Sequence, residues 1–230
     1  MGIKPLEVKL GRLSLKTPII IASGIFSYGE VNLDYIDYKK LGAITTKTIT
    51  FNPRKGNPQP RIWETPSGMI NSIGLQNPGI KEFIKRKLYS INIPGVKTIV
   101  SISGEDIDEI QRMTDLLIKK GVNAIELNLS CPNVNRKNMV SQSPDDTYSF
   151  VKAVRDTAEN ITLIAKLSPN VTDITEVAVA AEKGGADALN LTNTVKGTAV
   201  DIEKKRIIEG GLSGPAIKPI SLRAVFDVYK

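Results

Sequence analysis

The sequence predicts an α/β protein, a (β/α)8 TIM barrel with about six βα units that follow an N-terminal β-hairpin. The first observation is that short apolar segments of strand length alternate with segments of helical period. These short segments are apolar nearly throughout, which is typical of parallel strands buried on both faces. They cover residues 18–22, 43–46, 98–102, 124–129, 162–167 and 186–191.

The second observation is that each of these segments ends in a polar or reactive side chain. In a barrel all carboxyl ends of the strands meet at one mouth, whereas in a doubly wound sheet the ligand contacts mainly the strands at the switch point. The first segment is also not followed by the GxGxxG pattern of dinucleotide-binding folds. A barrel is therefore preferred, and the side chains expected at its mouth are Ser23, Lys47, Ser101, Asn128, Lys166 and Asn193.

The elements between the strands have their own signals. Apolar residues alternate with polar ones at 6–10 and 13–15, and Gly11-Arg12 between them can form the turn of a hairpin. Apolar residues recur with helical period at 80–88, 107–117 and 174–181. Ser143 followed by Pro144 marks a helix start, and Asp173 with Glu176 resembles a capping box. Helix ends are marked by a cation followed by glycine at 40–42, 120–121 and 183–185.

The length is short for the predicted fold. A complete barrel needs roughly 250 residues, whereas this chain has 230 and uses the hairpin and residues 48–78 without adding barrel strands. We therefore expect a single domain over 1–230 that stops within or after its sixth helix, with two strand-helix units missing.

Composition excludes several classes of function. The chain has no histidine, which excludes Ser-His and Cys-His nucleophile pairs and imidazole zinc sites. Its one cysteine cannot form an internal disulfide, its N-terminus lacks a signal-peptide core, and its apolar runs are too short to span a bilayer. The net charge of +7 comes from scattered cations without interleaved aromatic residues. We expect a cytoplasmic protein with no membrane and no nucleic-acid partner.

Three sets of residues can carry chemistry. Cys131 follows the strand at 124–129, where a barrel keeps catalytic groups, although a lone cysteine is ordinarily a small buried hydrophobe. Lys47 and Lys166 end apolar strands and would bring ammonium groups to the mouth, which implies an anionic ligand or, alternatively, an ion pair with Glu126. Amides at 71–79, Asn128 and Asn193 with Thr194 suit a planar heterocycle that presents C=O and N–H groups. The glycine-rich 210–215 is equally consistent with a cofactor contact and a plain loop.

Together these motifs resemble class 1 dihydroorotate dehydrogenase in order along the chain, and residues 53–77 are closer to subclass 1B. The motifs are Ala22-Ser23-Gly24, Thr46-Lys47-Thr48, Pro53-Arg54-Lys55-Gly56-Asn57, Asn71-Ser72-Ile73-Gly74-Leu75-Gln76-Asn77, Asn128-Leu129-Ser130-Cys131-Pro132-Asn133, Lys166-Leu167-Ser168-Pro169 and Leu212-Ser213-Gly214-Pro215.

The resemblance implies an FMN enzyme that oxidises dihydroorotate to orotate in de novo pyrimidine (UMP) biosynthesis, with Cys131 as the general base and flavin as the hydride acceptor. It implies FMN contacts from Ser23, Lys47, Thr48, Asn128, Lys166, Thr192 and Gly214. It implies substrate contacts from Lys47, Asn71, Ser72, Ile73, Gly74, Leu75, Asn128, Asn193 and Thr194. No metal site is implied.

Two departures from the family pattern bear on the cofactor. Ser101 stands where many subclass 1B members have an asparagine, so that flavin contact is not carried over. The family's last two strands, whose loops hold the FMN phosphate, have no counterpart before Lys230. We expect these 230 residues alone to bind FMN weakly or not at all.

The resemblance also implies partner subunits, and the residues leave alternative functions open. The resemblance implies a homo-oligomer and a second subunit that carries FAD and an iron-sulfur cluster, with NAD as the final acceptor, since one cysteine cannot ligate a cluster. The alternatives are a pyrimidine-reducing FMN barrel like that of dihydropyrimidine dehydrogenase, a non-catalytic fragment or binding subunit, and a Schiff-base aldolase that uses Lys47 or Lys166.

Overall fold

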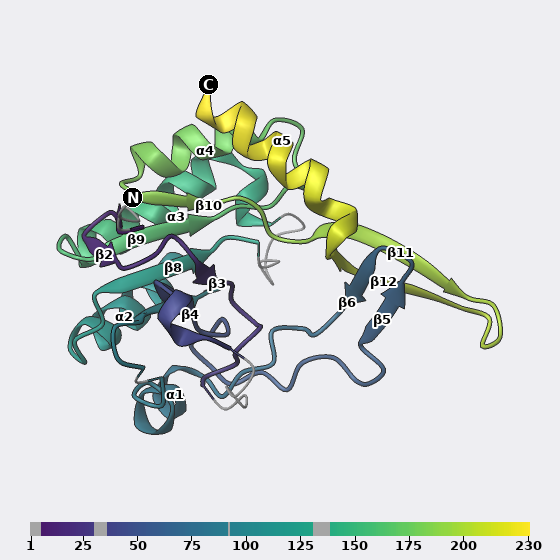
Figure 1. The fold of residues 1–230 in the computed structure, drawn as a ribbon, viewed down its shortest axis with the longest axis horizontal. Coiled ribbons are helices and arrows are strands. Elements are labelled where there is room, and N and C mark those ends of the chain that lie inside the picture. The colour runs from purple at the N-terminus through teal and green to yellow at the C-terminus, as the bar shows by residue number, and fades with distance from the viewer. Residues whose placement is uncertain (1–5, 30–35, 92, 131–138) are drawn as a thin grey trace, which may run out of the picture.

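A parallel six-stranded sheet forms the centre of the protein. The computed structural model describes residues 6–29, 36–91, 93–130 and 139–230 (Figure 1). The sheet consists of β3 (Ile20–Ile21), β4 (Ala43–Thr45), β7 (Lys97–Ile102), β8 (Ala124–Asn128), β9 (Thr162–Lys166) and β10 (Ala188–Asn190). Its strands are all parallel and lie side by side in chain order, from β3 at one edge to β10 at the other. All six predicted strands are confirmed, as is the incomplete barrel.

Helices cover the outer face of this sheet. Every second strand residue, such as Val100, Ile125 and Leu163, packs into one large apolar cluster with helix residues. These helices are α1 (Ile80–Arg86), α2 (Ile107–Ile118), α3 (Pro144–Thr157), α4 (Ile174–Lys183) and α5 (Lys218–Tyr229). Burial of this cluster is the main driving force that holds helices and sheet together. No helix in the described ranges is both long and apolar enough to cross a membrane.

The helix starts follow local side-chain chemistry. Ser143 accepts a hydrogen bond from the amide of Asp146 at 3.2 Å, which confirms the predicted cap of α3. Asp173 caps α4, but it accepts from the amide of Thr175 at 2.8 Å rather than from that of Glu176. Single 3-10 turns lie at η1 (Tyr38–Lys40), η2 (Val140–Gln142) and η3 (Pro215–Ile217).

The other set of strand residues faces inward and begins with an apolar floor. Ala43, Ile99, Ala124 and Ile164 pack against Leu13 and Leu15. These leucines belong to the predicted hairpin, in which β1 (Val8–Leu10) pairs antiparallel with β2 (Leu13–Leu15). The hairpin therefore closes the amino-terminal end of the curved sheet, and any ligand reaches the interior from the opposite end.

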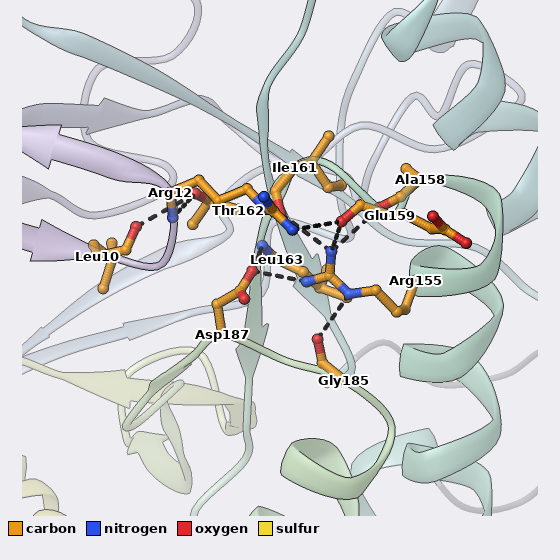
Figure 2. Close-up of polar contacts among 10 residues, drawn as sticks. All are labelled: Leu10, Arg12, Arg155, Ala158, Glu159, Ile161, Thr162, Leu163, Gly185 and Asp187. Atoms are coloured by element: carbon orange, nitrogen blue, oxygen red, sulfur yellow. Dashed lines mark hydrogen bonds and ion pairs between the residues drawn. The ribbon is translucent and has the colours of Figure 1, made fainter.

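Polar contacts fasten this closed end (Figure 2). The guanidinium of Arg155 donates to the carbonyls of Ala158, Glu159, Ile161 and Gly185 and pairs with Asp187 at 2.7 Å. Asp187 also accepts from the amide of Leu163 at 2.8 Å. The hairpin joins through Thr162, whose hydroxyl accepts from the amide of Arg12 at 2.9 Å. Three elements that are far apart in the sequence are thereby tied to β9.

A second, antiparallel sheet lies beside the barrel, to the right in Figure 1. Its order is β11 (Val195–Asp201), β12 (Arg206–Ser213), β6 (Gly68–Asn71) and β5 (Ile62–Thr65). Residues 48–78 indeed add no barrel strand, but they hold half of another sheet, which the sequence pattern does not predict. The glycine-rich segment at 210–215, for which a loop was one of two interpretations, is largely strand.

Close packing explains the glycines of β12. A Cβ atom on Gly211 would lie 2.1 Å from the hydroxyl oxygen of Thr194, and one on Gly210 would lie 2.3 Å from the carbonyl oxygen of Asn71. Only glycine permits this approach without a shift of the neighbouring strand or of the Thr194 side chain.

Candidate active site

The open end of the barrel carries a polar layer directly above the apolar floor. Side chains alternate along a strand, so the residue two positions after each floor residue also faces inward. On β7, β8 and β10 these next inward positions are Ser101, Glu126 and Asn190, and on β9 the position is Lys166. The change from apolar to polar within one step along each strand marks where the packed core ends and a site can begin.

A chain of hydrogen bonds joins this layer across the sheet. The hydroxyls of Ser23 and Thr48 lie 3.3 Å apart, and those of Thr48 and Ser101 lie 2.9 Å apart. Ser101 donates to Oε1 of Glu126 at 3.0 Å. The amide nitrogen of Asn190 donates to Oε2 of the same carboxylate at 2.7 Å. These hydrogen bonds connect the carboxyl ends of β3 and β4 with β7, β8 and β10.

Asn128 extends this chain toward the loop after β10. Its Nδ2 donates to the hydroxyl of Thr48 at 3.2 Å. Its Oδ1 accepts from the amide of Ser130 at 3.1 Å and from the side chain of Asn193 at 3.5 Å. Of the predicted residues, Ser23, Thr48, Asn128 and Asn193 are therefore brought together in one connected network.

The two lysines predicted for the mouth have no partner in the described part of the chain. Lys166 is only 8% exposed, and Lys47 is half-buried. Neither ammonium forms an ion pair or hydrogen bond with a described residue, and both oxygens of Glu126 are taken by Ser101 and Asn190. Burial lowers the pKa of Lys47, and the nearby positive charge of Arg61 lowers it further. Buried cations without a partner favour an anionic or oxygen-rich ligand.

The antiparallel sheet brings Asn71 to Thr194. Asn71 is the last residue of β6 and pairs with Gly211 of β12, to whose carbonyl its side chain donates at 3.2 Å. Gly211 in turn packs against the hydroxyl of Thr194, which precedes β11. Asn170, after β9, donates to the Thr194 carbonyl at 3.1 Å and fixes the start of β11. The sheet missed in the sequence thus holds two of the predicted substrate residues.

The loop at 72–75 is held from one side by Asn57. The side chain of Asn57 donates to the carbonyl and hydroxyl of Ser72 at 2.8 and 2.9 Å, and its amide donates to the carbonyl of Ile73 at 3.0 Å. Gly74 and Leu75 both have positive φ, 72° and 51°. At Leu75 this conformation is uncommon for a residue with a side chain, so the loop is shaped by its neighbours.

Besides the two lysines and the loop at 72–75, the predicted residues Thr192, Gly214 and Cys131 are not joined to this network by the described contacts. The hydroxyl of Thr192 shares a hydrogen bond of 3.1 Å with Ser221 of α5. Gly214, with φ of 94°, lies before η3 and beside Gly68. Cys131 lies outside the described residues, although the amide of the preceding Ser130 is anchored on Asn128.

Two residues of the network, Glu126 and Asn190, were not predicted as site residues. The sequence pattern indicates Glu126 only as an ion-pair partner for the lysines. The available signal was a carboxylate two positions before Asn128 in the otherwise apolar strand Ala124–Asn128, because that spacing places both on the inner face. No group of three or more acidic or cysteine ligands suited to a metal exists among the described residues.

Comparison with known proteins agrees with these features. The sequence profile described as dihydroorotate dehydrogenase matches residues 5–230. A protein of Thermoanaerobacter pseudethanolicus named dihydroorotate dehydrogenase B (NAD(+)), catalytic subunit, is 47% identical over 230 residues, which are 98% of this chain and 76% of that protein. Proteins of the same name from Bacteroides thetaiotaomicron and Trichlorobacter lovleyi are 46% and 45% identical, again over 98% of this chain and 76% of their own length. The chain therefore belongs to the dihydroorotate dehydrogenase family, and within it to the class 1B catalytic subunits.

Proposed function

We infer that the protein oxidises dihydroorotate to orotate in pyrimidine (UMP) biosynthesis, with FMN as the hydride acceptor. The observation that carries this inference is the polar layer at the open end, where two ammonium groups without a described partner lie among carboxamides and hydroxyls. Dihydroorotate is a heterocycle that presents C=O and N–H groups along its ring and bears a carboxylate. An amide-rich site with fixed cations suits both parts of that molecule.

The residues at the open end also fit the ring of FMN. Ser23, Thr48 and Asn128 present hydroxyl and amide groups on one connected network, and the nearby Lys166 supplies a positive charge for ring oxygens. Gly24, with φ of 97°, has open space where a Cβ would stand, so its backbone can approach a flat ligand. Bound FMN supplies a two-electron acceptor for the hydride that leaves C6 of the substrate. Thr192 and Gly214, near α5, are assigned to the remainder of the cofactor.

The remaining predicted residues at the open end are assigned to binding and orienting the substrate. The ammonium of Lys47 is assigned to the carboxylate of dihydroorotate, because a lysine whose charged form is disfavoured by burial and by Arg61 gains most from an anion. Asn71, Asn193 and Thr194, with the loop at 72–75, are assigned to the C=O and N–H groups of the pyrimidine ring. Held in this way, the substrate is oriented before any bond changes.

Cys131 is assigned the role of general base. Its thiolate removes the proton from C5 of the substrate, which leaves an electron pair to form the C5–C6 double bond as the hydride departs from C6. An ammonium group close to a cysteine favours the thiolate over the thiol in general, which is how cysteine can serve as a base without histidine.

A partner subunit completes the reaction cycle. The similar proteins are named catalytic subunits of an NAD(+) enzyme. We propose that electrons leave this chain to a second subunit that carries FAD and an iron-sulfur cluster and that passes them to NAD. One cysteine in these 230 residues cannot ligate such a cluster, which supports its assignment to the other subunit.

The test is anaerobic mixing of the protein with dihydroorotate in the presence of excess added FMN, because these 230 residues alone are expected to bind FMN weakly. Loss of the oxidised flavin absorbance is expected with the wild type and is expected to be strongly slowed in Cys131→Ala. Glu203→Gln, an exposed change in the turn between β11 and β12, is the matched control and should behave as the wild type. Reduction by dihydrouracil but not by dihydroorotate would instead indicate a reductase for neutral pyrimidines.

A further inference from the structure

Glu126 has no role in the mechanism above, yet it occupies the centre of the polar layer. It is 2% exposed on β8, and each of its oxygens accepts one hydrogen bond, from Ser101 at 3.0 Å and from Asn190 at 2.7 Å. Burial of a carboxylate costs several kcal/mol of desolvation that its hydrogen bonds must offset, a cost that an apolar residue at this position would avoid.

A carboxylate can only accept hydrogen bonds, and this fixes the direction of its neighbours. Ser101 has one hydroxyl hydrogen and gives it to Glu126, so its oxygen must accept from Thr48. Thr48 has then used its own hydrogen, so its oxygen accepts from Nδ2 of Asn128 and from the hydroxyl of Ser23. The directions of the Ser101–Thr48 and Thr48–Ser23 bonds therefore follow from Glu126, whereas the amide of Ser130 independently holds Oδ1 of Asn128 as an acceptor.

The second arm is fixed in the same way. Asn190 must present its NH2 group to Glu126, which leaves its carbonyl oxygen free to face elsewhere. Asn190 is the register partner of Lys166 on β9. On the first arm, Asn128 has given its NH2 group to Thr48, and its carbonyl oxygen serves Ser130 and Asn193.

We propose that Glu126 is a positioning residue whose carboxylate sets the direction of the hydrogen-bond chain from Asn190 to Ser23. It thereby fixes which groups of Ser23 and Thr48 are presented to the FMN ring. This proposal rests on the proposed function only in naming FMN as the ligand. It adds that a residue that does not touch the cofactor determines the pattern of donors and acceptors that the cofactor meets.

Glu126→Gln tests the proposal with almost no change in size. One end of glutamine is a donor, so either the Ser101 arm must reverse or Asn190 must turn its amide over. We expect the Kd of FMN, measured by fluorescence titration of the apoprotein, to rise about 10-fold or more, the scale of one misdirected hydrogen bond to a charged group. The visible spectrum of bound FMN should shift as well. Glu126→Asp, which keeps an acceptor-only group, should recover part of both effects.

A double-mutant cycle separates direction from packing. Ser101→Ala removes the link between Glu126 and Thr48 and is small enough to be tolerated. If Glu126 acts through Ser101, the FMN Kd of the double variant Ser101→Ala plus Glu126→Gln should equal that of Ser101→Ala, with no further loss. A purely structural effect would multiply instead. Denaturation midpoints of each variant identify any loss caused by unfolding.

Two outcomes would overturn the proposal. The first is an unchanged FMN Kd and flavin spectrum in Glu126→Gln, and the second is fully multiplicative effects in the cycle. Failure of the proposed function would give a different result: the wild type would bind FMN, but dihydroorotate would not reduce the bound flavin. The FMN affinities and flavin spectra of the variants would still test the role of Glu126.

Discussion

The two ends of the barrel differ in whether their polar and charged groups have partners in the described part of the protein. At the closed end, β2 leucines seal an apolar floor and the guanidinium of Arg155 bonds to four carbonyls and one carboxylate. At the open end, Lys47 and Lys166 have no described partner, and Leu75 adopts a positive φ. One end therefore supplies free energy of folding, while the other keeps polar groups without protein partners for a ligand.

The largest expected effect is on chemistry at the open end. Cys131→Ala should slow flavin reduction by dihydroorotate by about 10²- to 10⁴-fold, the typical contribution of a general base. Cys131→Ser should fall between the alanine variant and the wild type, because a hydroxyl is a much weaker base at neutral pH. Stopped-flow absorbance measures both rates. Equal rates for alanine and wild type would remove Cys131 from the mechanism.

The closed end should respond in stability instead. Leu15→Ala opens a cavity in the floor and should lower the free energy of unfolding by about 2–5 kcal/mol. Urea denaturation measures the loss. The Kd of FMN for the folded protein should stay within about twofold of the wild type, since distant sites couple weakly. A large change in FMN affinity would show that floor and mouth are not independent.

Arg155→Met sharpens the same comparison with a polar group. The variant loses bonds to four carbonyls and the pair with Asp187, and we expect a loss of about 2 kcal/mol of stability. The loss is kept moderate because both side chains are partly exposed and water can reach them. Lys152→Met, which removes an exposed helix pair with Asp156, is the control and should change stability little. Urea midpoints that are equal for the two variants would contradict a special role for Arg155.

Much of the barrel could be predicted because its signals are local. Apolar strands, the cap at Ser143 and glycine after helix-terminal lysines all depend on residues close in sequence. The antiparallel sheet could not be predicted in this way, since β6 pairs with β12 across about 140 residues and glycines weaken the strand pattern of β12. At the site, strand ends indicated Asn128 and Lys166, whereas the role of Glu126 depends on Asn190, which lies 64 residues away.

The smallest expected effect concerns the pH dependence of stability at the open end. The pKa of Lys47 is lowered in the folded protein, so over the pH range just below the usual lysine pKa the unfolded chain binds more protons than the folded one. Stability contributed by this residue should therefore rise with pH across that range. Below the lowered pKa both states are protonated, and the cost of burying the ammonium is fully present.

Lys47→Met should abolish this rise, and Arg61→Gln should reduce it, because burial is the larger cause and Arg61 the smaller. Urea midpoints of the three proteins at a series of pH values up to about 10.5, near the usual lysine pKa, measure the slopes. A bound anion should act in the opposite direction, since it stabilises the charged lysine. If dihydroorotate does not weaken the rise in the wild type while it binds, the carboxylate is held elsewhere than at Lys47.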